Sequence, residues 1–359
     1  MDTYPVTAQC VGRFFQTDGK KLQRAYKDHL SDFDSWEQKE HASEYVLLEK
    51  NMGEYLSIDE TMLHNDLYTF LSNKDGHGKR GTLVAAIKGT TIKEVSRQLM
   101  KIPEEQRLAV KEVTMDFSDS MFGIVKACFP NAEIVIDCFH IMQLVGKGMD
   151  EMRMKIKRAA RTERNKEERE FKKKLERRAK NRAKYAQTHK PKLSKNKKKL
   201  GRPRKRKDEK FKPEKLSNEE TLLDLLTHVR YPLLKSGDDW SDFQKKEMKI
   251  LFELYPRMQT ANGLLCSLRS IFKKHQSRKE AKEALEEWGK NVGKSLIREL
   301  ISARDSIMEK EEYVLNYFNN RSTNASAESL NSKMKGFRAQ LRGVADMPFF
   351  MYRMVKIFG

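Results

Sequence analysis

Three short β-branched runs, each ending in an aspartate, constrain the fold of this 359-residue chain more than any other feature. The runs are EYLSID, EVTMD and EIVID, and their last residues are Asp59, Asp116 and Asp137. In a mostly parallel sheet, carboxylates at the carboxyl ends of strands point into the crevice where ligands bind. Clustered carboxylates are costly unless a cation lies between them, and a divalent metal is the usual one. The pattern therefore suggests metal-dependent phosphoryl chemistry.

The segments between these runs predict the order of strands and helices. Two more β runs, LYTFLSN and TLVAAIKG, follow the first and are separated by a Gly-rich turn, which is typical of an antiparallel hairpin or meander. A helix with a 3.6-residue apolar period then ends at Pro103. A second short helix, around 122–129, lies between EVTMD and EIVID and ends at Pro130. The predicted order is strand, strand, strand, helix, strand, helix, strand.

Composition divides the chain into five parts. They are an N-terminal helical segment at 1–50, an α/β segment at 51–145, a basic and partly disordered segment at 146–218, a helical insertion at 219–320, and a C-terminal helix at 321–359. The first part is expected to be amphipathic, since six apolar residues have roughly helical spacing there. These six are Phe14, Phe15, Leu22, Tyr26, Leu30 and Phe33.

Most of the formal net charge of +21 lies in the basic segment. Residues 153–215 hold 30 Lys and Arg against 8 Asp and Glu, which leaves a net charge of −1 on the rest of the chain. Such a block is typical of an anchor for a polyanion, and nucleic acid is the expected partner. The alternative is a solvated tract with no dedicated ligand.

A short motif within this segment resembles an AT-hook, whose arginines lie in the minor groove of A·T-rich DNA. Its core is Gly201-Arg202-Pro203, and the basic residues that follow are Arg204, Lys205, Arg206 and Lys207. We expect these residues to contact DNA, either by minor-groove insertion or by non-specific binding to phosphates.

The last helical pattern, NASAESLNSKMKGFRAQLRG, adds a fourth acidic residue. Asn324 or Ser326 is the expected N-cap, and Leu330, Met334, Phe337 and Leu341 form an apolar stripe. Glu328 lies off that stripe, and Lys335, two turns later, shares its face. Glu328 could simply interact with the helix dipole, or it could be the third carboxylate of a two-metal site.

The order Asp, Asp, long helical insertion, Glu on a terminal helix resembles the DDE transposases of bacterial insertion sequences. The DCFH and NASAESLNSKMK segments most resemble the ISL-three family, and its ISAon-type branch in particular. The resemblance covers roughly residue 54 to the C-terminus. It implies an α/β, ribonuclease-H-like fold, with three antiparallel strands, then parallel crossovers, and a large all-helical insertion before the last catalytic helix. The segment 51–145 would then be the first part of the catalytic core, and the C-terminal catalytic helix at 321–359 would complete it.

The resemblance also implies roles for individual residues. Asp59, Asp116 and Glu328 become the catalytic metal ligands, with Asp119 as another candidate for the metal. Asp137 and His140 become auxiliary residues, although a histidine packed against the core is the alternative for His140.

We also interpret three residues near the proposed ligands: Lys335, Arg321 and Glu60. Lys335 occupies the position of a phosphate-contacting lysine in some relatives. The arginine that those relatives carry four residues before the glutamate is Asn324 here, so Arg321 is the candidate substitute. Glu60 is interpreted as a cap or turn residue, because neighbouring side chains on a strand face opposite ways.

The implied mechanism uses two Mg²⁺ ions, with Mn²⁺ as a substitute, for hydrolytic nicking at the element's ends and then strand transfer into target DNA. The expected partners are the double-stranded DNA of the transposon ends and target, and a second copy of the chain in a homodimer or higher multimer. Many members of this family recognise their ends with an N-terminal zinc-binding element and a helix-turn-helix, but no metal-ligand spacing appears in residues 1–50. End recognition is therefore expected from a separate polypeptide or from the basic segment, or it is lost in a decayed copy.

The expected location is the bacterial cytoplasm, near the nucleoid. No secretory signal and no apolar run long enough to span a membrane is visible in the sequence. Two alternative functions remain open: a metal-dependent nuclease of the same fold without strand transfer, and a non-enzymatic DNA-binding protein whose acidic residues are structural.

Overall fold

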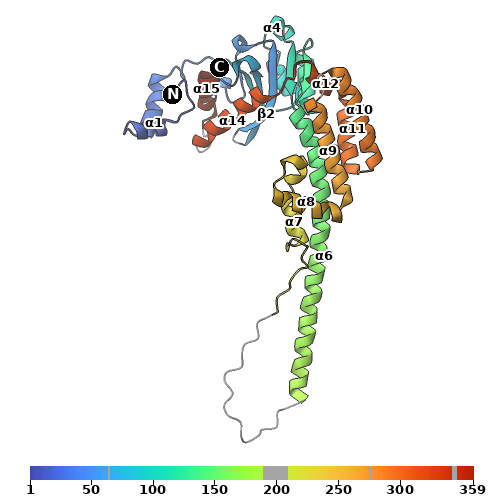
Figure 1. Ribbon diagram of the computed structural model, residues 1–359. Helices are drawn as coiled ribbons and strands as arrows, with labels where there is room; N and C mark the ends of the chain where they lie inside the picture. The colour runs from blue at the N-terminus through green and yellow to red at the C-terminus, as the bar shows by residue number, and fades with distance from the viewer. Residues whose placement is uncertain (64, 189–208, 275–276, 342–345) are drawn as a thin grey trace. The chain divides into compact units, whose positions relative to one another are not determined.

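The computed structural model describes residues 1–63, 65–188, 209–274, 277–341 and 346–359 (Figure 1). The chain folds into two compact units. The first comprises Met1–Leu144, Ser270–Gly289 and Asp305–Gly359, and the second comprises Val145–Arg269 and Lys290–Arg304. The segment predicted as one helical insertion, 219–320, is therefore shared between the two units.

The first unit contains a six-stranded mixed sheet with the strand order β1-β4-β3-β2-β5-β6. The strands are β1 (Tyr45–Leu47), β2 (Tyr55–Leu63), β3 (Asp66–Asn73), β4 (Leu83–Lys88), β5 (Glu112–Met115) and β6 (Glu133–Ile136). Strands β1 to β4 pair antiparallel, whereas β2, β5 and β6 pair parallel. This mixed α/β architecture is compatible with a ribonuclease-H-like transposase fold, and β1 is a strand that the sequence pattern did not predict.

Strand β2 is longer than the pattern predicts, and this corrects two interpretations. Its parallel pairing with β5 stops at Ile58, but its antiparallel pairing with β3 continues to Leu63. The strand continues because Thr61 and Leu63, on alternate positions, are buried. Asp59 therefore lies within a strand rather than at its end, and Glu60 is a strand residue rather than a cap or turn.

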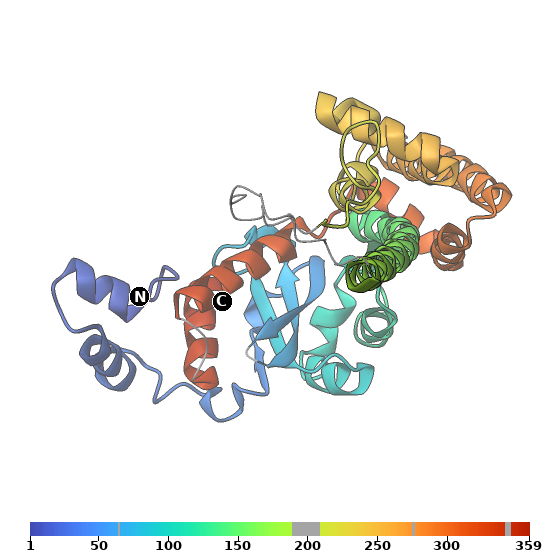
Figure 2. The same cartoon turned by 90° about the horizontal axis from the view of Figure 1, so that it is seen from below.

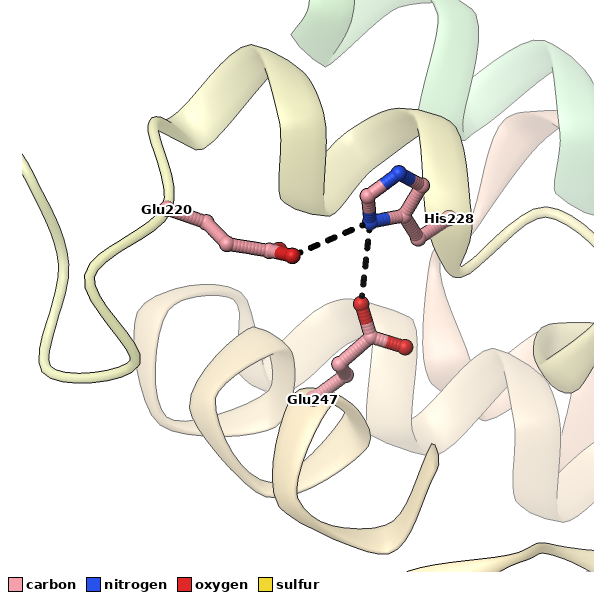
Figure 3. A group of neighbouring side chains, drawn as sticks. All are labelled: Glu220, His228 and Glu247. Carbon is pink, nitrogen blue, oxygen red and sulfur yellow. Dashed lines mark ion pairs between the residues drawn. The ribbon is translucent and has the colours of Figure 1, made fainter. Parts of the chain in front are cut away.

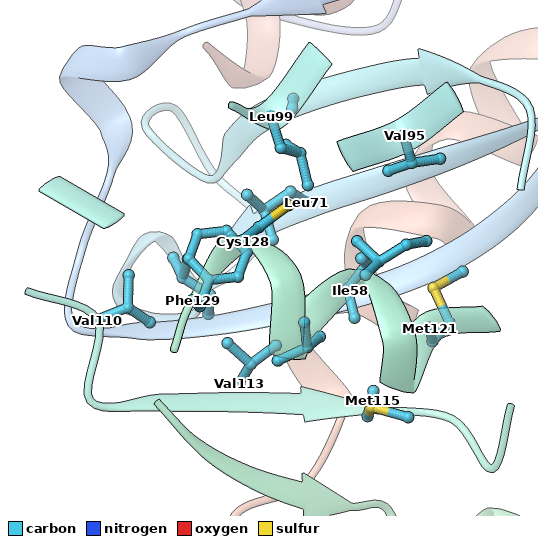
Figure 4. Close-up of a cluster of buried hydrophobic side chains, with 14 of the residues drawn as sticks. Ile58, Leu71, Val95, Leu99, Val110, Val113, Met115, Met121, Cys128 and Phe129 are labelled. Carbon is cyan, nitrogen blue, oxygen red and sulfur yellow. The ribbon is translucent and has the colours of Figure 1, made fainter. Parts of the chain in front are cut away.

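One face of the sheet is covered by α3 (Ile92–Leu99) and α5 (Asp119–Cys128), with the short α4 (Glu104–Leu108) beside them. Val95, Leu99 and Cys128 from this layer pack on strand residues such as Ile58 and Leu71 (Figure 4). Each fully buried aliphatic side chain contributes about 1.5–3 kcal/mol, so this cluster holds the strands that end beside the acidic residues.

The opposite face is covered by α14 (Ala325–Gln340) and α15 (Met347–Phe358), drawn in red in Figures 1 and 2. The predicted apolar stripe of α14 packs there, because Leu330, Met334 and Phe337 are buried in a cluster with strand residues such as Phe70. Asn324 occupies the N-cap position of α14, although its side chain makes no capping hydrogen bond.

The N-terminal segment contains short helices separated by a break. It forms α1 (Ala8–Phe14), α2 (Gly19–Ala25) and a π-helical turn at Tyr26–Leu30, with a break where Gln16 adopts a positive φ of 52°. The break disrupts the helical spacing, so Phe14, Phe15 and Leu30 are exposed. By contrast, Tyr26 and Phe33 are buried against two aromatic residues of α15, Phe349 and Tyr352.

The first part of the basic segment is helical. The 51-residue helix α6 (Cys138–Thr188) starts next to the sheet and carries basic residues that are almost all exposed from Arg161 onward. The DNA-binding candidates Arg202, Arg204, Lys205, Arg206 and Lys207 lie outside the described residues. Within the described ranges, none of the helices has the length and apolar character needed to cross a membrane.

Between residues 222 and 320 the described chain is mainly helical. Its α-helices are α7 (Leu222–His228), α8 (Asp242–Leu254), α9 (Pro256–Lys274), α10 (Arg278–Ser295), α11 (Arg298–Glu309), α12 (Glu311–Leu315) and α13 (Tyr317–Asn320). Of these, α12 packs on β6 within the first unit, where Asn316 donates a hydrogen bond to the carbonyl of Ile134 (2.9 Å). This contact fixes the polypeptide that leads into α14 beside the ends of the parallel strands.

Candidate active site

A polar pocket of about 400 Å³ in the first unit brings five of the predicted site residues together. Its lining residues are Asp59, Glu60, Asp116, His140, Glu328, Asn331, Ser332 and Lys335. They come from β2, the turn after β5, the first turn of α6, and α14. The three proposed ligands, the auxiliary histidine and the proposed phosphate-contacting lysine thus share one pocket.

Sheet register and helix spacing explain why these residues meet. Ile58 of β2 pairs with Met115 of β5, so the next residue of each segment, Asp59 and Asp116, leaves the parallel pairing at the same level. On α14, residues three, four and seven positions after Glu328 lie on its face of the helix. That face therefore presents its polar side chains to the two aspartates.

Asp59 has a strongly perturbed carboxyl group. Burial, followed by the negative charge of Asp116, raises the pKa of Asp59 to about 7. Asn331 donates a side-chain hydrogen bond to one carboxylate oxygen, and the backbone N–H of Glu60 donates to the other (2.7 Å). The pKa of Glu60 is also raised, first by burial and then by Asp116. The pocket therefore concentrates negative charge that the protein compensates only in part.

Asp116 has two side-chain partners. Nδ1 of His140 lies 2.7 Å from its Oδ1, and the amide of Asn324 donates to the same oxygen (3.3 Å). Burial opposes a charge on His140, but the hydrogen bond and charge of Asp116 prevail, and the pKa of His140 is raised. His140 is thus a polar partner of Asp116 within the pocket.

Asp137 lies behind the pocket and is not among its lining residues. It is only 3% exposed. One carboxylate oxygen accepts from the backbone N–H of Phe139 (3.0 Å) and the other from that of Asn324 (3.3 Å). Asp137 therefore caps the start of α6 and fastens the start of α14 to it.

Two other candidates lie away from the pocket. The Asp119 side chain is 91% exposed and forms an ion pair with Lys310. The guanidinium of Arg321 donates to the carbonyl of Phe272 (2.6 Å) and lies 5.2 Å from the ring centroid of Phe318. Because both side chains are engaged elsewhere, the structure does not bring Asp119 or Arg321 to the other site residues.

Sequence reasoning missed four residues that contribute to the site. Glu60, Asn331 and Ser332 line the pocket, and Asn324 bonds Asp116 from beside it. The face shared by Glu328 and Lys335 was recognised, and the same helical spacing would have indicated Asn331 and Ser332 between them. Asn324 was interpreted only as an N-cap and as the residue that replaces an arginine; its contact with Asp116 left no local pattern, because the two residues are 208 positions apart in the sequence.

The donor set fits hard divalent cations. Carboxylate and amide oxygens are the ligands that Mg²⁺ prefers, and the side-chain oxygen of Asn331 is buried without a hydrogen-bond partner beside Asp59. Among the described residues, the ligand atoms of Asp59, Asp116 and Glu328 do not form a group with all atoms within 4.8 Å of one another.

Comparison with known proteins identifies the family. The family model of the ISL-three group, described as a transposase, matches residues 56–202 and 196–354, a span that contains all residues lining the pocket. No curated protein and no solved structure matches the chain. Since the match covers well over half of the sequence, this chain belongs to the ISL-three family of transposases.

Proposed function

We propose that this transposase cuts and joins DNA with a DDE site formed by Asp59, Asp116 and Glu328, on a ribonuclease-H-like fold. The observation that carries the proposal is the single pocket lined by these three carboxylates. The raised pKa of Asp59 supports it, because a buried carboxyl beside a second carboxylate is the environment that a bound cation would relieve.

The same three residues would hold two Mg²⁺ ions, for which Mn²⁺ would substitute. When bound, such ions supply a nucleophilic oxygen at neutral pH and stabilise the charge that develops on the leaving oxygen. The hydrolytic and strand-transfer steps can use one set of ligands, because both are in-line displacements at a phosphate.

The other pocket residues have supporting roles in this proposal. Asn331 orients Asp59, while His140 and Asn324 orient Asp116. Lys335 lines the pocket and supplies the positive charge that would attract a DNA phosphate. Its charge also lowers the pKa of Asp59, although burial and Asp116 outweigh it.

DNA binding is assigned to the exposed basic residues of α6 and to the Lys/Arg-rich segment that follows it. Phosphate contacts from such residues give affinity without sequence readout. We further propose that two copies of the chain pair the two element ends, that a separate polypeptide can supply end recognition, and that the chain belongs to the ISAon-type branch.

A strand-cleavage assay tests the chemistry. Purified protein and a plasmid that carries the element's ends should give nicked products with Mg²⁺ or Mn²⁺ and none with EDTA. A pre-cut end with a free 3′-hydroxyl should then be joined to target DNA. Nicking without joining would indicate a nuclease, and the absence of metal-dependent cleavage would contradict the enzymatic proposal.

A series of salt concentrations tests whether the Lys/Arg-rich segment after α6 anchors the protein to DNA. Deletion of residues 190–210 removes 12 Lys and Arg residues, and it should weaken DNA binding and flatten the dependence of log K on log salt concentration. Variants that neutralise Lys in α10 give a control for loss of surface charge elsewhere. A salt dependence equal to that of the full chain would contradict the anchor role of this segment.

A further inference from the structure

A second cluster of ligand-type side chains lies in the second unit, separate from the residues of the catalytic pocket (Figure 3). Glu220 directly precedes the N-cap of α7, His228 is the last residue of that helix, and Glu247 lies in the middle of α8. Within the described residues, this is the group whose ligand atoms all lie within 4.8 Å of one another.

The spacing of the ligand atoms suits a metal better than hydrogen bonds. Nδ1 of His228 lies 3.3 Å from a carboxylate oxygen of Glu220 and 3.3 Å from one of Glu247. Charge-assisted hydrogen bonds between nitrogen and carboxylate oxygen are shorter, about 2.7–2.9 Å. Zinc bonds of about 2.0–2.1 Å place tetrahedral ligands roughly 3.3–3.4 Å apart.

Glu247 gives an independent indication of a missing ligand. Its side chain is 2% exposed, and the carboxylate oxygen that points at His228 is buried, with the 3.3 Å ion pair to Nδ1 of His228 as its contact. A buried carboxylate oxygen held by one long contact is costly, and such groups are usually compensated by a cation or a hydrogen-bond network.

The surroundings position the three side chains. The amide of Asn218 donates to the second carboxylate oxygen of Glu220 (3.3 Å), as outer partners of metal ligands commonly do. His228 lies at the C-terminal end of α7, where the helix dipole favours positive charge. Leu225 and Leu226 of α7 are fully buried, as are Met248 and Leu251 of α8, so both helices that carry ligands are anchored.

We propose that Glu220, His228 and Glu247 bind a zinc ion that clips the chain before α7 to α8. One imidazole nitrogen and two carboxylate oxygens are a donor set that zinc accepts. The exposed side of the site, where half of the His228 side chain is accessible, leaves the fourth position to water. The role is structural, in the unit that carries the basic helix, and it does not depend on the proposed chemistry of the catalytic pocket.

Zinc retention by the full chain tests this site. Protein stripped with a chelator is equilibrated with Zn²⁺, passed through a desalting column and analysed for zinc per chain. Wild type and Asp59→Asn should each retain one zinc at this site, whereas His228→Gln and Glu247→Gln should lose it. Both substitutions are conservative in size, and circular dichroism checks that the helices remain.

Hydrogen exchange localises the effect. Zinc should slow exchange of peptides from 216–254 in wild type and leave them unchanged in His228→Gln. Equal zinc retention and equal exchange in wild type and both site variants would overturn the proposal and leave His228 as a side-chain partner of the two glutamates alone. Because Asp59→Asn removes a ligand of the catalytic pocket, its unchanged zinc content separates this outcome from any failure of the proposed DNA chemistry.

Discussion

Asp116 and Asp137 follow the ends of neighbouring parallel strands, β5 and β6, yet they have opposite surroundings. The Asp116 side chain is 32% exposed and lines the pocket. Its bonding partners, His140 and Asn324, contact it through their side chains. Asp137 is buried and accepts two backbone N–H groups. Similar sequence patterns, a β-branched run followed by aspartate, thus precede a residue suited to chemistry and a residue suited to structure.

The residues that follow each aspartate explain the difference. Asp137 is followed immediately by α6, whose unpaired first N–H groups attract a carboxylate. Asp116 is separated from α5 by Phe117 and Ser118, so no helix start takes up its carboxylate. In these two segments, the number of residues between the strand and the next helix determines the role of the aspartate. Asp137 caps a helix, whereas Asp116 stays available in the pocket.

The largest expected difference between Asp116 and Asp137 is in the rate of DNA cleavage. Asp116→Asn should lower metal-dependent nicking by roughly 10³-fold or more, because a metal ligand contributes several kcal/mol to the transition state. Asp137→Asn keeps the shape of the side chain and one hydrogen-bond acceptor, so its nicking rate should fall far less than that of Asp116→Asn. Both are measured as initial nicking rates at saturating Mg²⁺, and an active Asp116→Asn beside an inactive Asp137→Asn would reverse the assignment.

Stability should show the opposite ranking. Asp137→Ala leaves two backbone N–H groups without their acceptor at the start of α6 and α14, and it should lower the free energy of unfolding by about 2–3 kcal/mol. Asp116→Ala should cost less than about 1 kcal/mol, since its side chain is partly exposed. Urea unfolding of the two variants measures the difference, and equal losses would remove the structural role of Asp137.

The negative charge of Asp59, which lies beside that of Asp116, should make the free energy of unfolding depend on pH. The pKa of Asp59 is about 7 when folded and about 4 in an unfolded chain, so its favourable contribution is complete below pH 4 and is lost as pH rises toward 7. Asp59→Asn has no such charge, and without metal it should be more stable than wild type by roughly 1–3 kcal/mol at pH 8.

At pH 4 the difference between the two proteins should be close to zero. Unfolding in EDTA from pH 4 to pH 8 provides the measurement, with Asp119→Asn as a control for an exposed carboxylate that interacts with Lys310. A constant difference between Asp59→Asn and wild type across this range would show that Asp59 is not destabilised by its burial and by Asp116.

Strand-forming runs and the apolar stripe of α14 could be predicted because periodicity is local. The spacing rule also indicated that Glu328 and Lys335 share a face, and both line the pocket. The length of β2 could not be predicted, because it depends on pairing with β3 after β5 has stopped. Contacts across distant segments, such as Asn331 with Asp59 or His228 with Glu247, leave no local pattern.

Asn324 allows the roles of the two aspartates to be tested separately, because it donates a hydrogen bond to each of them from a different group. Its backbone N–H serves Asp137 and its side-chain amide serves Asp116. Asn324→Ala removes only the second bond, and no capping bond is lost because the side chain makes none. We expect nicking to fall about tenfold, as for other residues that orient a metal ligand, and the Mg²⁺ concentration for half-maximal rate to rise.

The same variant should retain the stability that Asp137→Ala loses, because the backbone donor to Asp137 remains. Ser332→Ala, a small polar residue in the same pocket and on the same helix, is the matched control for truncation near the site. A stability loss as large as that of Asp137→Ala with no change in Mg²⁺ dependence would mean that Asn324 supports the helix start alone. The orientation of Asp116 would then rest on His140, whose ion pair with it is the shorter of the two contacts.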